Sequence, residues 1–435
     1  MKLLTTEEAM LTCVRCGACR EVCPTLDITG READGPRGRV LMARSLIEGA
    51  IPVNQEIKDQ LDRCLLCSAC VDTCPIDVPV PDIVMLAKEK IKVEKMPKES
   101  FIVRKAKAFF FEKVIPFPTR LHKLGHLLWI YQKSGLQWLV RKSGIMKLFP
   151  SQLAQMERVM PEILSPGNRK PLPAMTLNSN QHVETPKNAA MFRGCIMDVM
   201  FRETNVNSLK LLSKSGFHVH TPSEQTCCGA LHMHNGNRKQ ATELAKQNIE
   251  AFEKSDAEYI VSNAGGCGAA LREYEELFRN DPGWLPRAKE FSSKVRDISE
   301  LIWEAGAIPA AVGEGERVTY QPSCHLQYVM KVKDAPAQLL KTVSNSQFVE
   351  LPGSKFCCGS AGIYNLLQPE MANDILDKKM GQVSKTQPDV LITANPGCFL
   401  QMKSGICREK KEETIKSVHI VDYLMETINR ADENG

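Results

Sequence analysis

From residue 188 onward, short apolar runs alternate with longer stretches of helical periodicity. Runs of this length predict strands, here at 189–192, 259–261, 317–320 and 390–393. The spacing of apolar positions between them predicts helices, the longest at 238–254 and 369–382. Because strands that alternate with helices build α/β units, this part of the chain is expected to be α/β.

Ahead of these units the periodicity is helical. It predicts helices at 39–47 and 55–66, and amphipathic helices at 121–131 and 135–148. The stretch 164–183 carries three prolines and is predicted to be a linker.

Composition bounds the class of protein. The chain has 435 residues, with 43% hydrophobic and 25% charged residues, which is typical of a globular protein of two or three domains. The formal net charge of +5 is too small to indicate nucleic-acid binding. No signal peptide is visible, and no apolar stretch reaches the roughly 18–20 residues of a membrane span. We expect a cytoplasmic protein, with peripheral attachment to the inner face of a membrane as an open alternative.

The 17 cysteines are unevenly distributed, with eight in residues 1–95, none in 96–187 and nine in 188–435. In a reduced, cytoplasmic protein, this many cysteines indicate metal binding rather than disulfides. The first eight form two copies of the run C-x2-C-x2-C-x3-C-P. Their cysteines are Cys13, Cys16, Cys19 and Cys23, followed by Cys64, Cys67, Cys70 and Cys74.

This run is the bacterial two-cluster ferredoxin pattern, in which the fourth cysteine of each copy ligates the other cluster. We therefore predict two [4Fe–4S] clusters with crossed ligation. Cys13, Cys16, Cys19 and Cys74 would hold one cluster, and Cys64, Cys67, Cys70 and Cys23 the other. A zinc site needs only four ligands in two pairs and is a poor match. The 40 residues between the motifs predict a helical form of the domain. Nearby arginines such as Arg15, Arg37 and Arg39 are mostly expected to be solvated.

Eight of the last nine cysteines form an internal repeat, and the ninth, Cys407, belongs to neither copy and is expected to be structural. Cys195, Cys227, Cys228 and Cys267 are spaced like Cys324, Cys357, Cys358 and Cys398. The gaps are 32 and 33 residues, then 39 and 40, so two halves of one design are expected. Each half closes with a similar amphipathic stretch, at 295–302 and 418–425. A glycine after each cysteine pair would let a backbone approach an anionic cluster. An additional cluster or redox site is favoured over buried structural cysteine, and both alternatives stay open.

Other chemistry is not apparent in the sequence. The segment at Gly266 resembles a dinucleotide-binding fingerprint but fails at its sixth position, and no other segment matches better. No flavin is therefore expected on this chain. No Ser-His-Asp set is evident, and no catalytic residue is assigned.

Residues 101–150 carry ten Lys or Arg, one acidic residue and nine aromatic residues. Three interpretations stay open: packed helices with snorkelling lysines, a surface for anionic lipid, or a docking face for a partner subunit. No nucleic-acid-binding motif accompanies the charge.

Taken together, RCGACREVCP, GREADGPRGRVLMARSLIEG, LDRCLLCSACVDTCP and the two cysteine-pair halves resemble the iron–sulfur subunit of glycolate oxidase (glycolate dehydrogenase). The resemblance covers nearly the whole chain, and DGPRGR (34–39) is its most specific part. The cysteine-pair halves also resemble domains of heterodisulfide reductase, where each half ends in CxxC. Here Cys267 and Cys398 lack that ending, so the five-cysteine cluster of that enzyme is not implied.

The resemblance implies an electron-transfer subunit of a 2-hydroxy-acid dehydrogenase complex that does not oxidise substrate by itself. Its implied partner is an FAD-containing 2-hydroxy-acid oxidase subunit, and its implied acceptor is a quinone or another acceptor at the membrane surface. The alternatives are an iron–sulfur subunit of a lactate or anaerobic glycerol-3-phosphate dehydrogenase, a heterodisulfide-reductase-like thiol–disulfide enzyme, and a scaffold with structural clusters.

These arguments predict an α+β multidomain protein. Residues 1–95 would form a mostly helical ferredoxin domain, and 96–187 a basic, aromatic-rich helical region with a linker. Residues 188–310 and 311–435 would form the two cysteine-rich α/β halves.

Overall fold

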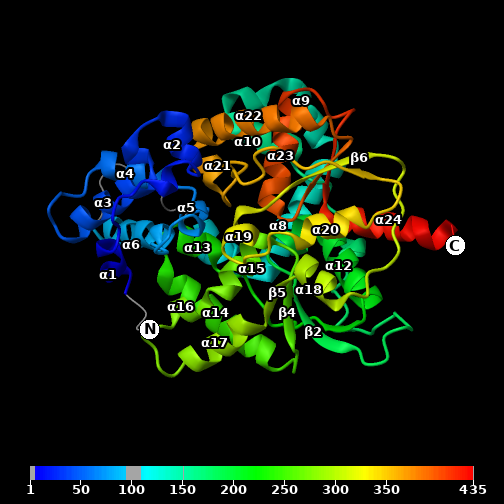
Figure 1. Ribbon diagram of the computed structural model, residues 1–435. Helices are drawn as coiled ribbons and strands as arrows, with labels where there is room; N and C mark the ends of the chain where they lie inside the picture. Colours follow the sequence, from blue (N-terminus) through cyan, green and yellow to red (C-terminus); the bar gives the residue numbers. More distant parts are fainter. Residues whose placement is uncertain (1–4, 95–108, 150, 435) are drawn as a thin grey trace.

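The computed structural model describes residues 5–94, 109–149 and 151–434 (Figure 1). Part of the basic segment predicted from the sequence, 101–108, lies outside the described residues. The structure is an α+β multidomain fold, as predicted, with a helical N-terminal unit and two separate sheets.

The N-terminal unit is built from short helices around one small core. Its elements are α1 (Thr6–Leu11), η1 (Ala18–Arg20), α2 (Pro24–Thr29), η2 (Glu32–Asp34), α3 (Pro36–Ile47), α4 (Gln55–Asp62), α5 (Ala69–Asp72) and α6 (Val80–Val93). Both α3 and α6 begin with a proline in the first turn, where its missing N–H costs nothing. Val40, Leu46, Ile83 and Val84 form the buried seam between these two helices.

The segment DGPRGR holds the turn at η2 against the start of α3. A Cβ atom at Gly38 would lie 2.1 Å from the carbonyl oxygen of Glu32, so only glycine fits there. Asp34 is buried and accepts a hydrogen bond from Arg63 at 3.2 Å. The segment is therefore a packing device that ties the first motif to the helix preceding the second.

The middle of the chain is helical and poorly buried. It comprises η3 (Phe110–Val114), α8 (Pro118–Lys133), α9 (Leu136–Ser143), η4 (Ile145–Leu148) and α10 (Ser151–Val159). The helix predicted at 121–131 lies within α8, whereas the one predicted at 135–148 is divided at Gly144, with φ of 70°, into α9 and the 3-10 helix η4. In α8 only Leu121 and Gly125 are buried, and α9 and η4 bury no residue. Such exposure is not what packed helices would show.

The first sheet has the strand order β1-β3-β2-β4-β5. Its strands are β1 (Met175–Thr176), β2 (Lys187–Phe192), β3 (Phe217–His220), β4 (Tyr259–Ser262) and β5 (Val295–Asp297). They are joined and covered by η5 (Pro166–Asn168), α11 (Ile196–Met200), α12 (Arg202–Lys214), α13 (Ala230–His234), α14 (Arg238–Glu253), α15 (Gly265–Arg272), α16 (Tyr274–Leu277), α17 (Leu285–Lys294) and α18 (Ile298–Ala305). All neighbouring strands are parallel except β1, which pairs antiparallel with β3.

The second sheet has the order β7-β6-β8-β9, and all of its strand pairs are parallel. Its strands are β6 (Arg317–Gln321), β7 (Gln347–Phe348), β8 (Val390–Thr393) and β9 (Lys416–His419). Its helices are α19 (Cys324–Tyr328), α20 (Ala335–Lys341), α21 (Tyr364–Leu367), α22 (Pro369–Thr386), α23 (Pro396–Arg408) and α24 (Ile420–Asn434).

The four parallel strands of each sheet follow the same order, second-first-third-fourth along the chain, so the repeat seen in the sequence is also a repeat of topology. The four predicted strands and two long helices are all present. Two details differ from expectation. Each closing amphipathic stretch splits into a short strand and a helix, and the predicted linker contributes the edge strand β1.

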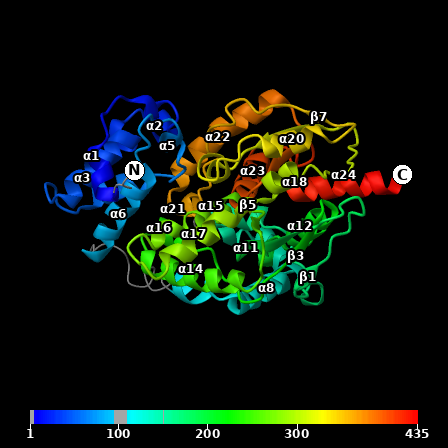
Figure 2. The same cartoon turned by 60° about the horizontal axis from the view of Figure 1, so that its bottom comes forward.

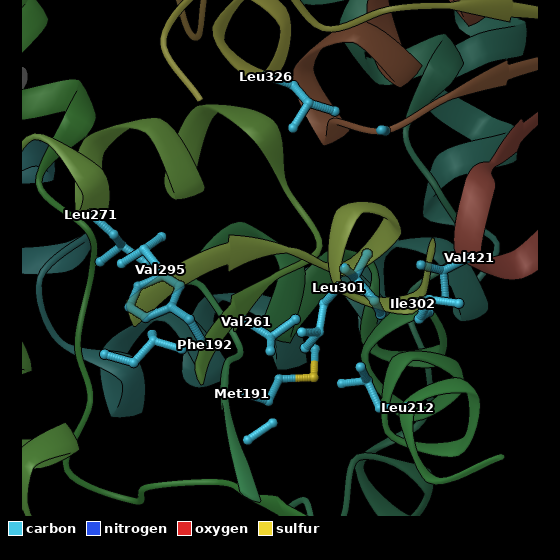
Figure 3. Packing of buried hydrophobic residues seen from close by; sticks show 14 of the residues in the cluster. Met191, Phe192, Leu212, Val261, Leu271, Val295, Leu301, Ile302, Leu326 and Val421 are labelled. Carbon is cyan, nitrogen blue, oxygen red and sulfur yellow. The ribbon is translucent and has the colours of Figure 1, made fainter. Parts of the chain in front are cut away.

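One hydrophobic core joins the two halves. In Figure 3, Met191 and Val261 of the first sheet lie near Leu301 and Ile302 of α18, with Val421 of α24 approaching from the second half. The N-terminal unit lies at one end, beside α21 and α22 (Figure 2). Ion pairs from Lys331 and Lys333 to Asp72 lie at this junction.

Two glycine substitutions test the packing argument. Gly38→Ala should destabilise the protein by about 1–3 kcal/mol, because its Cβ would overlap the Glu32 carbonyl. Gly381→Ala, on the exposed face of α22 with no atom within 4 Å of its Cβ, should stabilise it by about 0.4–1 kcal/mol. Chemical denaturation of both variants measures the difference. An unchanged free energy of unfolding for Gly38→Ala would contradict the packing role.

Candidate iron–sulfur centres

The eight cysteines of the N-terminal motifs line two neighbouring cavities. The first cavity is lined by Cys13, Cys16, Cys19 and Cys74, and also touches Cys70. The second is lined by Cys23, Cys64, Cys67 and Cys70. The fourth cysteine of each run therefore faces the cavity of the other run, which is the grouping that crossed ligation requires.

The backbone around the middle cysteine of each motif has the same unusual conformation. Arg15 and Gly17 flank Cys16 with φ of 58° and 91°, and Leu66 and Ser68 flank Cys67 with φ of 53° and 63°. Left-handed backbone at non-glycine residues costs energy and concentrates at functional sites. Where left-handed and right-handed residues alternate along the backbone, successive N–H groups point towards one place and form a concave site for an anion. The left-handed conformation at Leu66 could not be predicted from the spacing of the cysteines.

Among the described residues, no three His, Cys, Asp or Glu side chains converge as the ligands of a single ion would. The thiols instead surround two cavities, and Cys70 lines both of them. A [4Fe–4S] cluster takes one thiolate per iron, so its ligands surround a volume rather than a point. The donor set and its arrangement fit such a cluster.

Burial governs the charge of these thiols. It raises the pKa of Cys67 and Cys70, and neighbouring thiols raise it further. Without metal the thiols of Cys67 and Cys70 are therefore protonated, and cluster binding must release their protons.

Arg39 lies against the second cavity and is only 2% exposed. It donates to Thr25 Oγ1 at 3.1 Å and to the Gln60 carbonyl at 3.3 Å. Its guanidinium stays charged because, although burial lowers its pKa, the nearby Cys64 and Cys23 raise it above the ordinary value. Most arginines near the motifs were expected to be solvated, and Arg39 is an exception that the sequence did not distinguish.

The remaining paired cysteines gather in two further groups. In the first half, Cys227 interacts with Cys195 and Cys228, and Cys228 with Cys267. In the second half, Cys357 interacts with Cys324 and Cys358, and Cys358 with Cys398. We call these groups the first quartet (Cys195, Cys227, Cys228, Cys267) and the second quartet (Cys324, Cys357, Cys358, Cys398). Cys407 belongs to neither, as predicted from the sequence.

Each quartet lies at the carboxyl ends of parallel strands. In the first, Cys195 follows β2 and Cys267 follows β4; the second is built the same way on β6 and β8. These are the strands between which the chain reverses direction across the sheet, the usual place for a ligand in such folds. The glycine after each cysteine pair has φ near 90° and donates its N–H to the first thiol of the pair. The distance is 3.5 Å from Gly229 N to Cys227 Sγ and 3.4 Å from Gly359 N to Cys357 Sγ.

The thiol groups form a continuous series. The charge of Cys324 raises the pKa of Cys67, so the second quartet adjoins the second cavity. Cys324 Sγ lies 3.5 Å from His325 Nδ1, and the rings of His325 and His234 lie 5.5 Å apart. The charge of Cys228 also raises the pKa of His325, so the two histidines lie between the quartets.

Comparison with known proteins agrees with this arrangement. The chain matches a model of the 4Fe-4S dicluster domain over residues 9–78 and the cysteine-rich domain over 189–272 and 318–403. It matches the linker region of the glycolate oxidase iron–sulfur subunit over 102–160. A Bacillus subtilis (strain 168) protein named as a probable glycolate oxidase iron–sulfur subunit is 40% identical over 97% of this chain and 94% of its own length.

This chain belongs to the family of glycolate oxidase iron–sulfur subunits. The glycolate oxidase iron–sulfur subunit of Escherichia coli (strain K12) is 28% identical over 93% of the chain and 92% of its own length. Lactate utilization protein A of Oceanobacillus iheyensis is 34% identical but aligns with only 54% of the chain, while covering 95% of its own length.

Membership in this family makes the protein an iron–sulfur electron-transfer subunit of an oxidoreductase complex. In the part of the chain that the structure describes, no helix is long and apolar enough to cross a membrane. The number of clusters and their individual ligands stay predictions.

Serine variants test the crossed ligation. Cys23→Ser and Cys67→Ser should lose the same cluster, and Cys74→Ser and Cys16→Ser the other, because each pair lines one cavity. Iron analysis of the anaerobically reconstituted protein should show about four irons fewer in each variant. EPR spectra of the reduced variants should fall into those two pairs. Cys407→Ser is the matched control and should keep both signals. A Cys23→Ser spectrum that matches Cys16→Ser would overturn the assignment.

Proposed function

We propose that this subunit receives electrons from an FAD-containing 2-hydroxy-acid oxidase subunit and passes them to a quinone. The observation that carries the proposal is the continuous series of thiol groups, from the first cavity through the second cavity and the second quartet to the first quartet. We propose two [4Fe–4S] clusters in the cavities, with the crossed ligands given above, and a further iron–sulfur site in each quartet. Iron–sulfur clusters would supply one-electron transfer along the series.

The surface near the first cavity supports docking of a partner. Cys16 is exposed, and the apolar side chains of Leu11, Val14 and Ile76 are exposed by 60%, 70% and 45%. Val14 and Ile76 line the cavity itself. An exposed apolar rim around a partly exposed redox centre is suited to a protein partner that must come close.

Oxidation of a 2-hydroxy acid removes two electrons and two protons, whereas an iron–sulfur cluster takes one electron. A flavin links the two kinds of transfer, and the sequence has no flavin fingerprint. We therefore assign substrate oxidation to the partner. Glycolate is favoured over lactate because the glycolate oxidase relatives align with nearly the whole chain, including residues 102–160.

Attachment to a membrane surface is proposed for α8, α9 and η4, which we call the basic helical segment (residues 118–148). It has six Lys or Arg and no acidic residue. Its exposed apolar side chains are Leu127, Ile130, Leu136, Trp138, Leu139, Ile145 and Leu148. Lys133 and Arg141 pair with Glu162 and Glu157, but Lys142 and Lys147 have no ion pair with a described residue. Exposed apolar residues interleaved with lysines that have no ion pair favour an anionic lipid surface.

The division of labour predicts that the purified chain alone does not oxidise glycolate. It should be brown and redox-active, and anaerobic mixing with glycolate and an artificial dye should give no dye reduction. Adding the flavoprotein subunit should restore turnover. Cys67→Ser should then slow electron delivery to the acceptor while stopped-flow flavin reduction by glycolate continues. Dye reduction by the flavin-free chain would show that a catalytic site has been missed.

The lipid proposal predicts binding to vesicles that contain anionic phospholipid, and weaker binding to purely zwitterionic vesicles. Leu139→Glu combined with Leu148→Glu should reduce binding at least tenfold in a sedimentation assay, because both residues are more than half exposed in the segment. The control pair is Trp303→Glu with Leu367→Glu, whose residues are about 40% exposed on other elements. Equal loss in both pairs, or no binding by the wild type, would contradict the proposal.

A further inference from the structure

A cavity of about 700 Å³ lies between α8 and the start of the first half. Its volume is within the range of small-molecule sites. Charged and polar lining comes from His122 and His126 of α8, Arg169 after η5, Arg193 after β2, Asp198 of α11 and Arg202 of α12. Leu127, Pro166 and Pro171 supply apolar walls.

Asp198 is the centre of the charged wall and is 3% exposed. Its Oδ2 lies 3.0 Å from His122 Nε2 and 3.9 Å from Arg193 Nε, and its Oδ1 pairs with Arg202. Burial alone would raise the pKa of Asp198, but the hydrogen bond with His122 and the charges of Arg202 and Arg193 hold it below the ordinary value. The carboxylate is thus ionised and fixes the orientation of the His122 ring.

Arg169 completes the wall on the other side. Its guanidinium donates to the His122 carbonyl at 3.2 Å, while its buried Nε has no partner among the described residues. Gly125 allows this close fit, because a Cβ there would lie 2.6 Å from Val199 Cγ1 and 2.7 Å from Arg169 Nη1. The cavity is therefore closely packed on the side where α8 meets α11.

The cavity lies between two features already described. Arg193 and Asp198 lie two residues before and three residues after Cys195 of the first quartet, at the carboxyl end of β2. Leu127 both lines the cavity and is exposed, and Ile130 continues the apolar surface of α8. One wall thus belongs to the end of the thiol series and another to the helix proposed to meet lipid.

We propose that this cavity binds the headgroup of a quinone and that His122 delivers a proton to it. The proposal rests on the proposed function, because it names the place where the electron series ends. The quinone gains two electrons and two protons and becomes a quinol. The electrons come one at a time from the 2-hydroxy acid oxidised by the flavoprotein partner, through the iron–sulfur subunit. One proton comes from His122, whose side chain is 35% exposed and regains it from water, and the other comes from water.

The lining matches each stage of this reduction. Apolar walls accept the ring, while Arg169, Arg193 and Arg202 stabilise the negative charge that follows the first electron. His122 is within the cavity wall and held by Asp198, so it is placed as a general acid with Asp198 as a positioning residue. A free anion would use the arginines but gain nothing from Leu127, Pro166 and Pro171.

Photolabelling tests the site on the full chain without turnover. The reconstituted protein is irradiated with an azido-benzoquinone or an azido-naphthoquinone, and labelled peptides are mapped by mass spectrometry. Label should appear within 118–133 or 166–171 and be displaced by decylubiquinone or menadione. Thr119→Trp, which fills the cavity from its exposed rim, should reduce labelling at least tenfold; its neighbour Arg120, which is not in the lining, is the control as Arg120→Gln. Label only elsewhere, or protection by millimolar phosphate or glycolate but not by quinone, overturns the proposal.

Kinetics of the complex with its flavoprotein test the role of His122. His122→Gln should lower the ratio of quinone reduction to dye reduction at least tenfold, because a general acid is lost. Asp198→Asn should lower the same ratio by a smaller factor, because the imidazole remains but loses the carboxylate that orients it, and Asp198→Glu should restore most of the ratio. An unchanged ratio in all of these variants, with quinone reduction intact, overturns the cavity assignment but leaves the proposed function standing. Absence of dye reduction by the wild-type complex would instead count against the proposed function itself.

Discussion

The contact between the second ferredoxin motif and the second half is the constraint on which the rest of the structure depends. Leu65 and Ala69, on either side of Cys67, are buried with Cys324, Tyr328 and Cys357 in one cluster. The Tyr364 hydroxyl donates to the Arg63 carbonyl at 3.0 Å across the same junction. Electron transfer over a series of centres needs neighbours at fixed, short separations. An apolar seam that includes the thiols themselves fixes that separation better than ion pairs at its rim, which contribute little when exposed.

The same junction creates an electrostatic problem, because many thiols are buried close together. Different cations lie near the buried thiols of the ferredoxin domain and of the second half. Arg39 lies beside the second cavity, and Lys379, 1% exposed, lies near the second quartet and donates to the Gly353 carbonyl at 2.8 Å. Burial lowers the pKa of Lys379 to about 8, although the surrounding thiols oppose this shift. The same position of the corresponding helix α14 in the first half is occupied by Asn248, which is neutral and donates to the Cys227 carbonyl at 3.0 Å. The repeat thus keeps thiol positions and topology but not charge, so the iron–sulfur sites proposed for the two quartets would differ in reduction potential.

Some features of the site could be predicted from residue spacing, whereas others depend on tertiary packing. Cysteine spacing was enough to predict which thiols share a cavity. Three cysteines within seven residues can surround one cavity, and the fourth, which precedes a proline, lies where the chain turns away towards the other cavity. It could not single out Arg39, since its burial depends on the approach of α4 through Gln60. Nor could it resolve β5 and β9, because strands of three or four residues followed directly by a helix show no period of their own. The cavity at Asp198 was also not predicted, because its lining residues come from three separate stretches of the chain, 119–127, 166–171 and 193–202.

The exposed apolar side chains of the basic helical segment would be unfavourable in a purely structural element, so they indicate a function. Ordering a residue costs about 1–2 kcal/mol of backbone entropy, and helices in water recover this mainly by burying one face. Across α8, α9 and η4, only Leu121 and Gly125 are buried, yet the sequence is rich in Leu, Ile and Trp. A purely structural segment of this composition would turn those side chains inward. Their outward position, with lysines among them and no acidic residue from 118 to 148, is consistent with burial against something outside the chain. Because α8 also forms a wall of the cavity beside Cys195, such a contact would deliver a lipid-soluble acceptor to the point where the thiol series ends.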